Sequence, residues 1–544
     1  MRAPTTILLV FCIGSTSCAV KYDKAFVEAH LISVDAEGEA VRPVERTALK
    51  KKYVDYIQNI LCKADEASDK EGLCGCMVDK CPRESERHPG GSCARVRRIL
   101  VYVHGGLNTS DSSLETSDQL AKDILAEGNH ETREHDKPSD WHYPIFVTWP
   151  SGFFETYAEH LGQLRQGRHS RLLGYPSSPY YFVRDVASGV VNAPQSLMYQ
   201  GTTDTALGLK VLLGSDILPS SRNATKIYQA IGPKEPRPGE HPERMEFPID
   251  LKIHLGDYQR GGVAQTLRFL RYWTLFPLKV LNMCLFVDGM GTASWQVMLH
   301  RAHNLFRPAK EFETVYSSHS LGTIRDDDVN TAPSGAFAEF LRELDKHIEA
   351  EEECDRNLCY QITLVGHSLG AIILNRALEH FPRLPVTRIV YMAPACTIRD
   401  VEQSIVPLLK PTGRMVSPPF FHVLTLHPLA EADEIEAYDV VPRGSLLEWI
   451  DSFFTTPTAH GERRFGKWIN LIQALQIFMD VQKQVTIKGF GVDGDSLPQK
   501  HGDFNQCPFW RRSFWDPENK ELYYRSARIL EARVPEGKGP RRNN

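Results

Sequence analysis

A serine flanked by glycines is the residue of this chain whose type and setting most clearly suit chemistry. Ser368 stands at the centre of G-H-S-L-G, with Gly366 and Gly370 at the two ends. The β-branched, apolar run 362–365 precedes this motif, and the aliphatic run 371–374 follows it. A strand, a sharp turn and a helix in that order expose a G-x-S-x-G serine as a nucleophile. The glycines leave room for the turn, because bulkier Cβ atoms would clash across it. We therefore expect Ser368 to be a catalytic nucleophile rather than a helix cap.

Strands and helices are predicted to alternate on both sides of this motif, which is the arrangement that would position it. The expected strands are residues 98–103, 144–149, 362–365, 387–392, 421–426 and 485–490, and the expected helices are 47–61, 113–125, 153–165, 336–350 and 468–479. Strands connected by helices are typical of a parallel sheet. The sequence therefore predicts an α/β fold with a mostly parallel central sheet flanked by helices.

Composition and charge bound the class of protein. The chain has 544 residues, of which 42% are hydrophobic and 24% are charged, so it is long enough for one large decorated domain or two domains. The formal net charge is −5, and basic residues form no long run. We expect no nucleic-acid partner, because nucleic-acid binding needs a concentrated positive surface.

The N-terminus has the pattern of an export signal over residues 1–18. Arg2 supplies a positive charge, residues 7–13 are apolar, and residues 14–17 are small. Two processing outcomes remain open. The run Ser15-Thr16-Ser17-Cys18 resembles a bacterial lipobox, which would leave Cys18 lipidated, and cleavage after Ala19 is the alternative. We favour the lipoprotein and expect an exported protein, either membrane-anchored or secreted.

Cysteine usage agrees with export. Five cysteines crowd a short N-terminal region, at positions Cys62, Cys74, Cys76, Cys81 and Cys93. In an oxidising compartment this cluster predicts disulfides, whose connectivity the sequence does not define. A zinc site is the less favoured alternative, because the cluster lacks paired C-x-x-C spacing. We predict no metal.

Three sequence features together resemble the α/β-hydrolases of the lipase/esterase superfamily. They are the strand and turn 101–106, V-Y-V-H-G-G, then the G-x-S-x-G motif, then a histidine just beyond the last predicted strand. The resemblance implies an α/β-hydrolase fold, with a core over residues 96–160 and 335–515 and a large cap-like or lid-like insertion over 161–334. Residues 19–95 would form a cysteine-rich lead-in, and 516–544 a charged tail.

The same resemblance implies a Ser-His-acid triad in the chain order serine, acid, histidine. The histidine beyond the final strand is His501, which we expect to be the general base. The acid is expected in the carboxylate-rich loop after strand 421–426. Glu431 is the leading candidate, and Asp433 and Asp439 are the alternatives.

An oxyanion hole is expected from backbone amides on either side of the nucleophile. The N–H of Leu369 directly follows Ser368, and the H-G-G turn offers a second donor from Gly106 or Leu107. His104 is expected to brace this turn by hydrogen bonds. His367, beside the nucleophile, is expected to be a packing residue.

The insertion contains an apolar region, Leu267–Met298, with two interpretations. It could supply core helices of an inserted domain, or a lid that presents an apolar face to lipid. Pro277 and Lys279 interrupt the region, so a transmembrane span is not expected.

These features predict an exported serine hydrolase that cleaves carboxylic esters, most readily lipid-like ones, through an acyl-enzyme and without a cofactor. Its expected partners are a lipid or small ester substrate and a membrane surface, reached through a lipidated N-terminus or an apolar lid. Two alternatives stay open: a non-catalytic, surface-tethered binding protein on the same scaffold, and a peptidase or thioesterase of the same fold.

Overall fold

The computed structural model of the chain describes most of the expected core. The described residues are 23–68, 95–131, 141–162, 164–165, 168–169, 175–194, 251–259, 262–307, 333–355, 358–410, 418–435, 437–455, 457–494, 496–516 and 523–524. The predicted signal segment, Cys18, the cysteines at 74, 76, 81 and 93 and nearly all of the predicted tail lie outside them. Lipidation and disulfide pairing therefore stay predictions.

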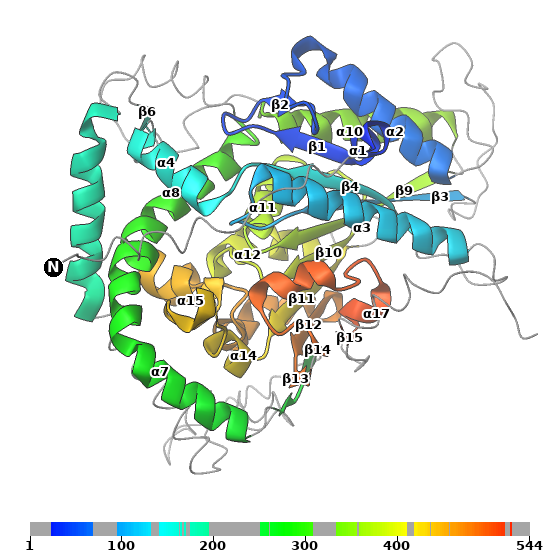
Figure 1. The fold of residues 1–544 in the computed structure, drawn as a ribbon. Coiled ribbons are helices and arrows are strands. Elements are labelled where there is room, and N and C mark those ends of the chain that lie inside the picture. Colours follow the sequence, from blue (N-terminus) through cyan, green and yellow to red (C-terminus); the bar gives the residue numbers. More distant parts are fainter. Residues whose placement is uncertain are drawn as a thin grey trace, which may run out of the picture.

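A nine-stranded, mostly parallel sheet forms the centre of the molecule (Figure 1). Its order is β2-β1-β4-β3-β9-β10-β11-β12-β7, and only β2 runs antiparallel to its neighbour. The strands are β1 (Leu31–Val34), β2 (Ala40–Val41), β3 (Arg95–Val103), β4 (Tyr143–Thr148), β7 (Lys252–Leu255), β9 (Leu358–His367), β10 (Val386–Met392), β11 (Phe420–Leu426) and β12 (Val485–Phe490). The sheet confirms the predicted α/β class.

Helices and short turns connect these strands. The longer ones are α2 (Tyr53–Ser68), α3 (Ser110–Glu131), α4 (Phe153–Gly162), α7 (Gly262–Asn282), the π-helix η4 (Met283–Met290), α8 (Gly291–Asn304), α10 (Ala336–Cys354), α11 (Gly370–His380) and α16 (Trp468–Gln473). A further helix covers residues 178–194. Short paired strands outside the main sheet are β5 (Leu164–Arg165) with β6 (Arg168–His169), β8 (Tyr258–Gln259) with β13 (Val492–Asp493), and β14 (Ser496–Leu497) with β15 (Tyr523–Tyr524).

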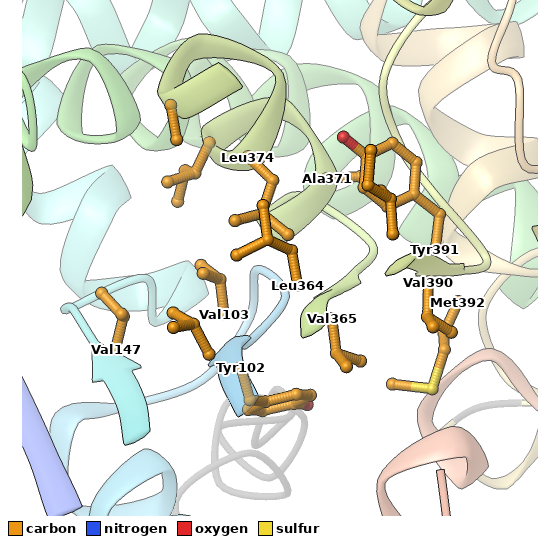
Figure 2. Packing of buried hydrophobic residues seen from close by; sticks show 14 of the residues in the cluster. Tyr102, Val103, Val147, Leu364, Val365, Ala371, Leu374, Val390, Tyr391 and Met392 are labelled. Atoms are coloured by element: carbon orange, nitrogen blue, oxygen red, sulfur yellow. The ribbon is translucent and has the colours of Figure 1, made fainter. Parts of the chain in front are cut away.

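The central strands are buried on both faces, which explains their nearly continuous apolar sequences. On one face, Leu364 of β9 packs beneath Ala371 and Leu374 of α11 (Figure 2). On the other face, the ring of Tyr102 in β3 stacks on Phe509, with centroids 4.7 Å apart. Helix α11 therefore covers one side of the sheet, and the C-terminal segment that follows His501 covers the other.

All six predicted strands are present, but the sheet extends beyond the predicted core. β1 pairs in parallel with β4, although it lies in the predicted lead-in, and β7 of the predicted insertion pairs in parallel with β12. Each is only four residues long, too short for a periodic signal, and its pairing partner lies far away in sequence. The predicted helix 468–479 divides into α16 and the 3-10 helix η9 (Leu475–Gln484).

The apolar region of the insertion forms α7, η4 and α8. Helix α8 is a core helix, because Trp295, Met298 and Ala302 are buried in the main hydrophobic cluster. Helix α7 instead exposes several apolar side chains. Among the helices that the structure describes, none has the length and apolar character needed to span a membrane.

Candidate active site

The predicted nucleophile lies where the connections of the sheet diverge. From β3 the chain continues to β4 on one side, and from β9 it continues to β10 on the other. In parallel sheets, ligands bind outside the carboxyl ends of strands at such a divergence. Ser368 follows β9, and the H-G-G turn follows β3. The topology therefore brings together two motifs that lie more than 250 residues apart in the sequence.

Ser368 lies in the sharp turn between β9 and α11, which we call the elbow, and its backbone there is strained. Its φ is 52°, in the left-handed region that residues other than glycine rarely adopt. Two backbone hydrogen bonds hold it there: its N–H donates to the Met392 carbonyl at 2.9 Å, and its carbonyl accepts from the Ala395 N–H at 2.9 Å. The strained turn is thus fixed by the loop that follows β10.

Three glycines permit the close packing around this turn. A Cβ on Gly370 would lie 2.2 Å from the Val103 carbonyl oxygen, and one on Gly366 would lie 3.0 Å from the Ala371 nitrogen. A Cβ on Gly105 would lie 2.8 Å from the Ser368 Cβ. The backbone of the H-G-G turn therefore lies directly against the nucleophile.

His104 braces the H-G-G turn, as predicted. Its Nδ1–H donates to the Gly105 carbonyl at 2.7 Å, and its Nε2 accepts from the Trp149 N–H at 3.1 Å. The imidazole also stacks on the Trp149 ring, with 8° between the planes. Burial lowers the pKa of His104 to about 4, so the ring is neutral at neutral pH and its two hydrogen bonds are compatible.

The predicted oxyanion donors come from two turns, the H-G-G turn after β3 and the elbow after β9. A Cβ on Gly106 would be 3.6 Å from Leu369 Cδ1 and 3.2 Å from Met298 Sδ of α8. Leu107 has a φ of 66°, and Leu369 caps the N-terminus of α11. Backbone amides at such a helix start carry partial positive charge. Of the residues named for the oxyanion hole, Gly106 and Leu369 thus lie against each other.

His501 lies on the other side of the elbow, at the start of the 3-10 helix η10 (His501–Gln506). Its imidazole centroid is 5.1 Å from that of His367, the residue before the nucleophile. Among the described residues, neither ring nitrogen of His501 nor the Oγ of Ser368 has a hydrogen-bond partner. Burial, with a smaller contribution from His367, lowers the pKa of His501 well below its ordinary value. The predicted base and the predicted nucleophile therefore lie near the same elbow without being hydrogen-bonded to each other.

His367 does more than pack. Its Nε2 donates a hydrogen bond to the carbonyl oxygen of His501 at 3.0 Å, so the elbow directly holds the loop of the predicted base. Burial lowers the pKa of His367 to about 4, and the ring is a neutral donor at neutral pH. Sequence reasoning missed this role because nothing in the motif reveals which loop the side chain meets.

The carboxylate that contacts the histidine loop is Glu434, which the sequence analysis did not select. Its Oε2 accepts a hydrogen bond from the His501 N–H at 3.0 Å. Nearby, Lys500 Nζ donates to the Ile435 carbonyl at 2.8 Å, which ties the two loops together again. Glu434 lies in the same acidic loop as the three predicted candidates, but nothing in the sequence shows which of these carboxylates contacts the histidine loop.

The three carboxylates named from sequence have other surroundings. Glu431 is fully buried, and burial raises its pKa to about 8 against the opposing charge of Lys467, so it is mostly uncharged at neutral pH. Asp433 forms ion pairs with Arg268 and Arg443. Burial would raise the pKa of Asp439, but hydrogen bonds from Arg443 and Lys279 hold it below its ordinary value.

One buried group of metal-ligand residue types lies far from the elbow in the fold, between α2, α10 and the start of β9. It comprises Asp65, His347 and Glu351. Arg97 Nη1 lies 3.1 Å from Asp65 Oδ1 and 3.1 Å from Glu351 Oε2, so a guanidinium already neutralises these carboxylates. We interpret the group as a buried ion-pair network.

Comparisons with protein-family models, curated proteins and solved structures returned no match. A strained serine, a buried histidine of lowered pKa, a carboxylate that accepts a hydrogen bond from the backbone of that histidine, and the H-G-G turn lie near the carboxyl edge of the parallel sheet. This arrangement has the parts needed for nucleophilic attack on a carbonyl carbon.

Proposed function

We propose that this protein is a serine hydrolase of α/β-hydrolase type that cleaves carboxylic esters, with lipid-like esters as the preferred class. The observation that carries the proposal is Ser368, held at a φ of 52° between a parallel strand and a helix, with the H-G-G turn on one side and His501 on the other.

In the proposed reaction, Ser368 Oγ attacks the ester carbonyl while His501 accepts its proton. The protonated imidazole then gives that proton to the departing alcohol, leaving an acyl group on Ser368. Water, deprotonated by His501, releases the acid. The Ser368–His501 hydrogen bond would form by rotation of the imidazole, since catalytic hydrogen bonds commonly tighten only when substrate is bound. Amides of Leu369 and of Gly106 or Leu107 would stabilise the oxyanion.

For the acid that orients His501, we propose a residue that the sequence analysis did not select. Glu434 accepts a hydrogen bond from the His501 backbone N–H. Asp433 and Asp439 instead form ion pairs with arginine or lysine side chains, and Glu431 is mostly protonated at neutral pH. Glu434 is therefore the acid we favour, with Glu431 as the alternative.

Hydrolysis of p-nitrophenyl esters of graded acyl length tests the proposal directly. We expect activity that Ser368→Ala abolishes and that Ser404→Ala retains, because Ser404 is also buried but its Oγ bonds to the Asp400 carbonyl in an ordinary helix. An active-site phosphonate should label the unmodified chain and not Ser368→Ala. If the unmodified chain neither hydrolyses any ester nor takes the label, the non-catalytic binding protein replaces this proposal.

Preference among acyl compounds is tested by the same series. A rate that rises with acyl length would support lipid-like substrates. Faster turnover of chromogenic peptides or thioesters than of esters would instead support the peptidase or thioesterase. Export and lipidation at Cys18 also remain proposals, and the mass of the N-terminal peptide from the purified protein would distinguish a lipidated Cys18 from cleavage after Ala19.

A further inference from the structure

Helix α7 has the polarity of its two faces reversed. Its buried side chains among the described residues, Tyr272, Lys279 and Asn282, all carry a polar group and are between 1% and 9% exposed. Its exposed side chains include four large apolar ones: Leu267 is 62% exposed, Leu270 56%, Trp273 44% and Leu281 50%. An ordinary surface helix of a water-soluble protein shows the opposite pattern.

Polar contacts fix this orientation. Lys279 Nζ pairs with Asp439 and donates to the Val441 carbonyl at 3.0 Å. Asn282 Nδ2 donates to the Val440 carbonyl at 2.7 Å. Turning α7 to bury its apolar face would break these contacts and leave Asp439, which is fully buried, without its lysine partner. Since removing one partner of a buried ion pair is strongly destabilising, the apolar face is held outward.

The 178–194 helix is reversed in the same way. Its Asp185 is buried, where Oδ2 accepts from Tyr157 Oη at 3.2 Å and lies 3.1 Å from His160 Nε2. Asn192 Nδ2 donates to Asp288 Oδ1 of η4 at 3.3 Å. The exposed side chains include five large apolar ones, Tyr180, Phe182, Val183, Val190 and Val191, each between 45% and 77% exposed.

The two helices are neighbours. A Cβ on Gly189 would lie 2.1 Å from the Cys284 carbonyl oxygen, so the 178–194 helix touches η4, which continues α7 without a break. In Figure 1 the 178–194 helix, in teal, lies at the left edge of the molecule and α7, in green, runs along its lower left, both away from the central sheet. We call their outward side chains the paired-helix surface, and it holds more than half of the large exposed apolar side chains of the described residues.

Charges on the paired-helix surface have one sign. The sequence of α7 contains Arg268, Arg271 and Lys279 but no Asp or Glu. The 178–194 helix adds Arg184, and its one acidic residue, Asp185, is buried. The Arg184 and Arg271 side chains are 43% and 54% exposed, and they pair with the carboxylates of Asp185 and Asp439, which are buried. The exposed charges beside the apolar side chains are therefore cations whose acidic partners face the protein, a pattern that matches the interface of an anionic bilayer.

We infer that the paired-helix surface is a docking site for an anionic lipid bilayer. A second copy of this chain fits less well, because a two-fold interface through α7 would bring like charges together with no carboxylate of that helix to pair with them. The purpose we assign to this docking, to bring a lipid ester to Ser368, rests on the proposed function. The geometry of the surface does not depend on it.

Vesicle flotation tests the inference. The full chain in a Cys18→Ser background, so that no lipid anchor contributes, is mixed with vesicles of phosphatidylcholine alone or with phosphatidylserine added. We expect binding that increases with phosphatidylserine. The triple variant Val191→Ser, Leu270→Ser, Trp273→Ser should bind at least about tenfold more weakly, because it removes apolar area that the lipid would bury.

Two controls keep this test specific. The triple variant Phe420→Ser, Ile469→Ser, Met479→Ser removes apolar side chains of similar exposure elsewhere and should bind as the parent chain does. Ser368→Ala should also bind normally, so that loss of catalysis and loss of docking are separate results. Both triple variants should retain the far-ultraviolet circular dichroism of the parent chain.

Equal vesicle binding by the two triple variants, or no binding by the parent chain, would overturn the inference. A dimer in sedimentation analysis that only the paired-helix variant loses, together with no vesicle binding, would assign the surface to a second copy instead.

Discussion

The Nε2 of His367 donates a hydrogen bond to the carbonyl oxygen of His501 at 3.0 Å. This bond joins the residue before the candidate nucleophile to the residue proposed as its base. Its consequence is that the elbow and the histidine loop, which come from β9 and from the chain after β12, are held at one fixed separation.

Replacing His367 tests whether that bond positions the base. We expect His367→Leu to lower kcat by about tenfold with little change in KM, because one intramolecular hydrogen bond is lost while substrate contacts stay. His367→Gln retains an amide donor near the position of Nε2 and should recover most of the rate. If both variants lose the same activity, His367 contributes packing alone.

Neutralising single acids of the carboxylate-rich loop distinguishes the proposed triad acids. Glu434→Gln should lower kcat by at least about a hundredfold, because an uncharged side chain stabilises the imidazolium poorly. Glu431→Gln should have a small effect, since this carboxyl is already mostly protonated at neutral pH. Steady-state kinetics on a short p-nitrophenyl ester decide the matter. A larger loss of kcat in Glu431→Gln than in Glu434→Gln would assign the role of triad acid to Glu431.

The pH profile of ester hydrolysis should reflect the burial of His501. A general base must be neutral, and lowering its pKa moves its protonation to more acidic pH. The acidic limb of kcat/KM is therefore expected to have its midpoint below about 6.5, the ordinary value for histidine. Tryptophan fluorescence at each pH separates titration from acid unfolding. A midpoint above that value would show that His501 is solvated in the working enzyme.

Substitution of Gly370 should destabilise the fold because there is no room for a side chain at this position. A Cβ there would lie 2.2 Å from the Val103 carbonyl oxygen, so Gly370→Ala should lower the free energy of unfolding by about 3 kcal/mol. Gly461→Ala is the matched control, since the nearest atom to its Cβ would be 3.8 Å away. Urea unfolding measures both. A Gly370→Ala variant as stable as the control would mean that α11 can shift away from β3.

Local features of this molecule follow from short stretches of its sequence. Short apolar runs rich in β-branched residues and bounded by turn residues favour buried strands, so the strands around Ser368, including 98–103 and 387–392, were predictable. The G-x-S-x-G spacing likewise predicted the strained turn, because its glycines answer a steric requirement within a few residues.

Which distant groups contact one another depends on the tertiary structure and could not be predicted from local sequence. Glu431, Asp433 and Glu434 are all carboxylates of one loop and cannot be told apart by sequence. In the structure, Asp433 pairs with Arg268 and Glu434 accepts a hydrogen bond from the His501 backbone. The strands β1 and β7 are too short to carry a periodic signal and join the sheet through long-range pairing. The outward apolar face of α7 also depends on tertiary contacts. Periodicity predicts that the helix has an apolar stripe, but the ion pair of Lys279 with buried Asp439 determines which side of the helix faces the protein.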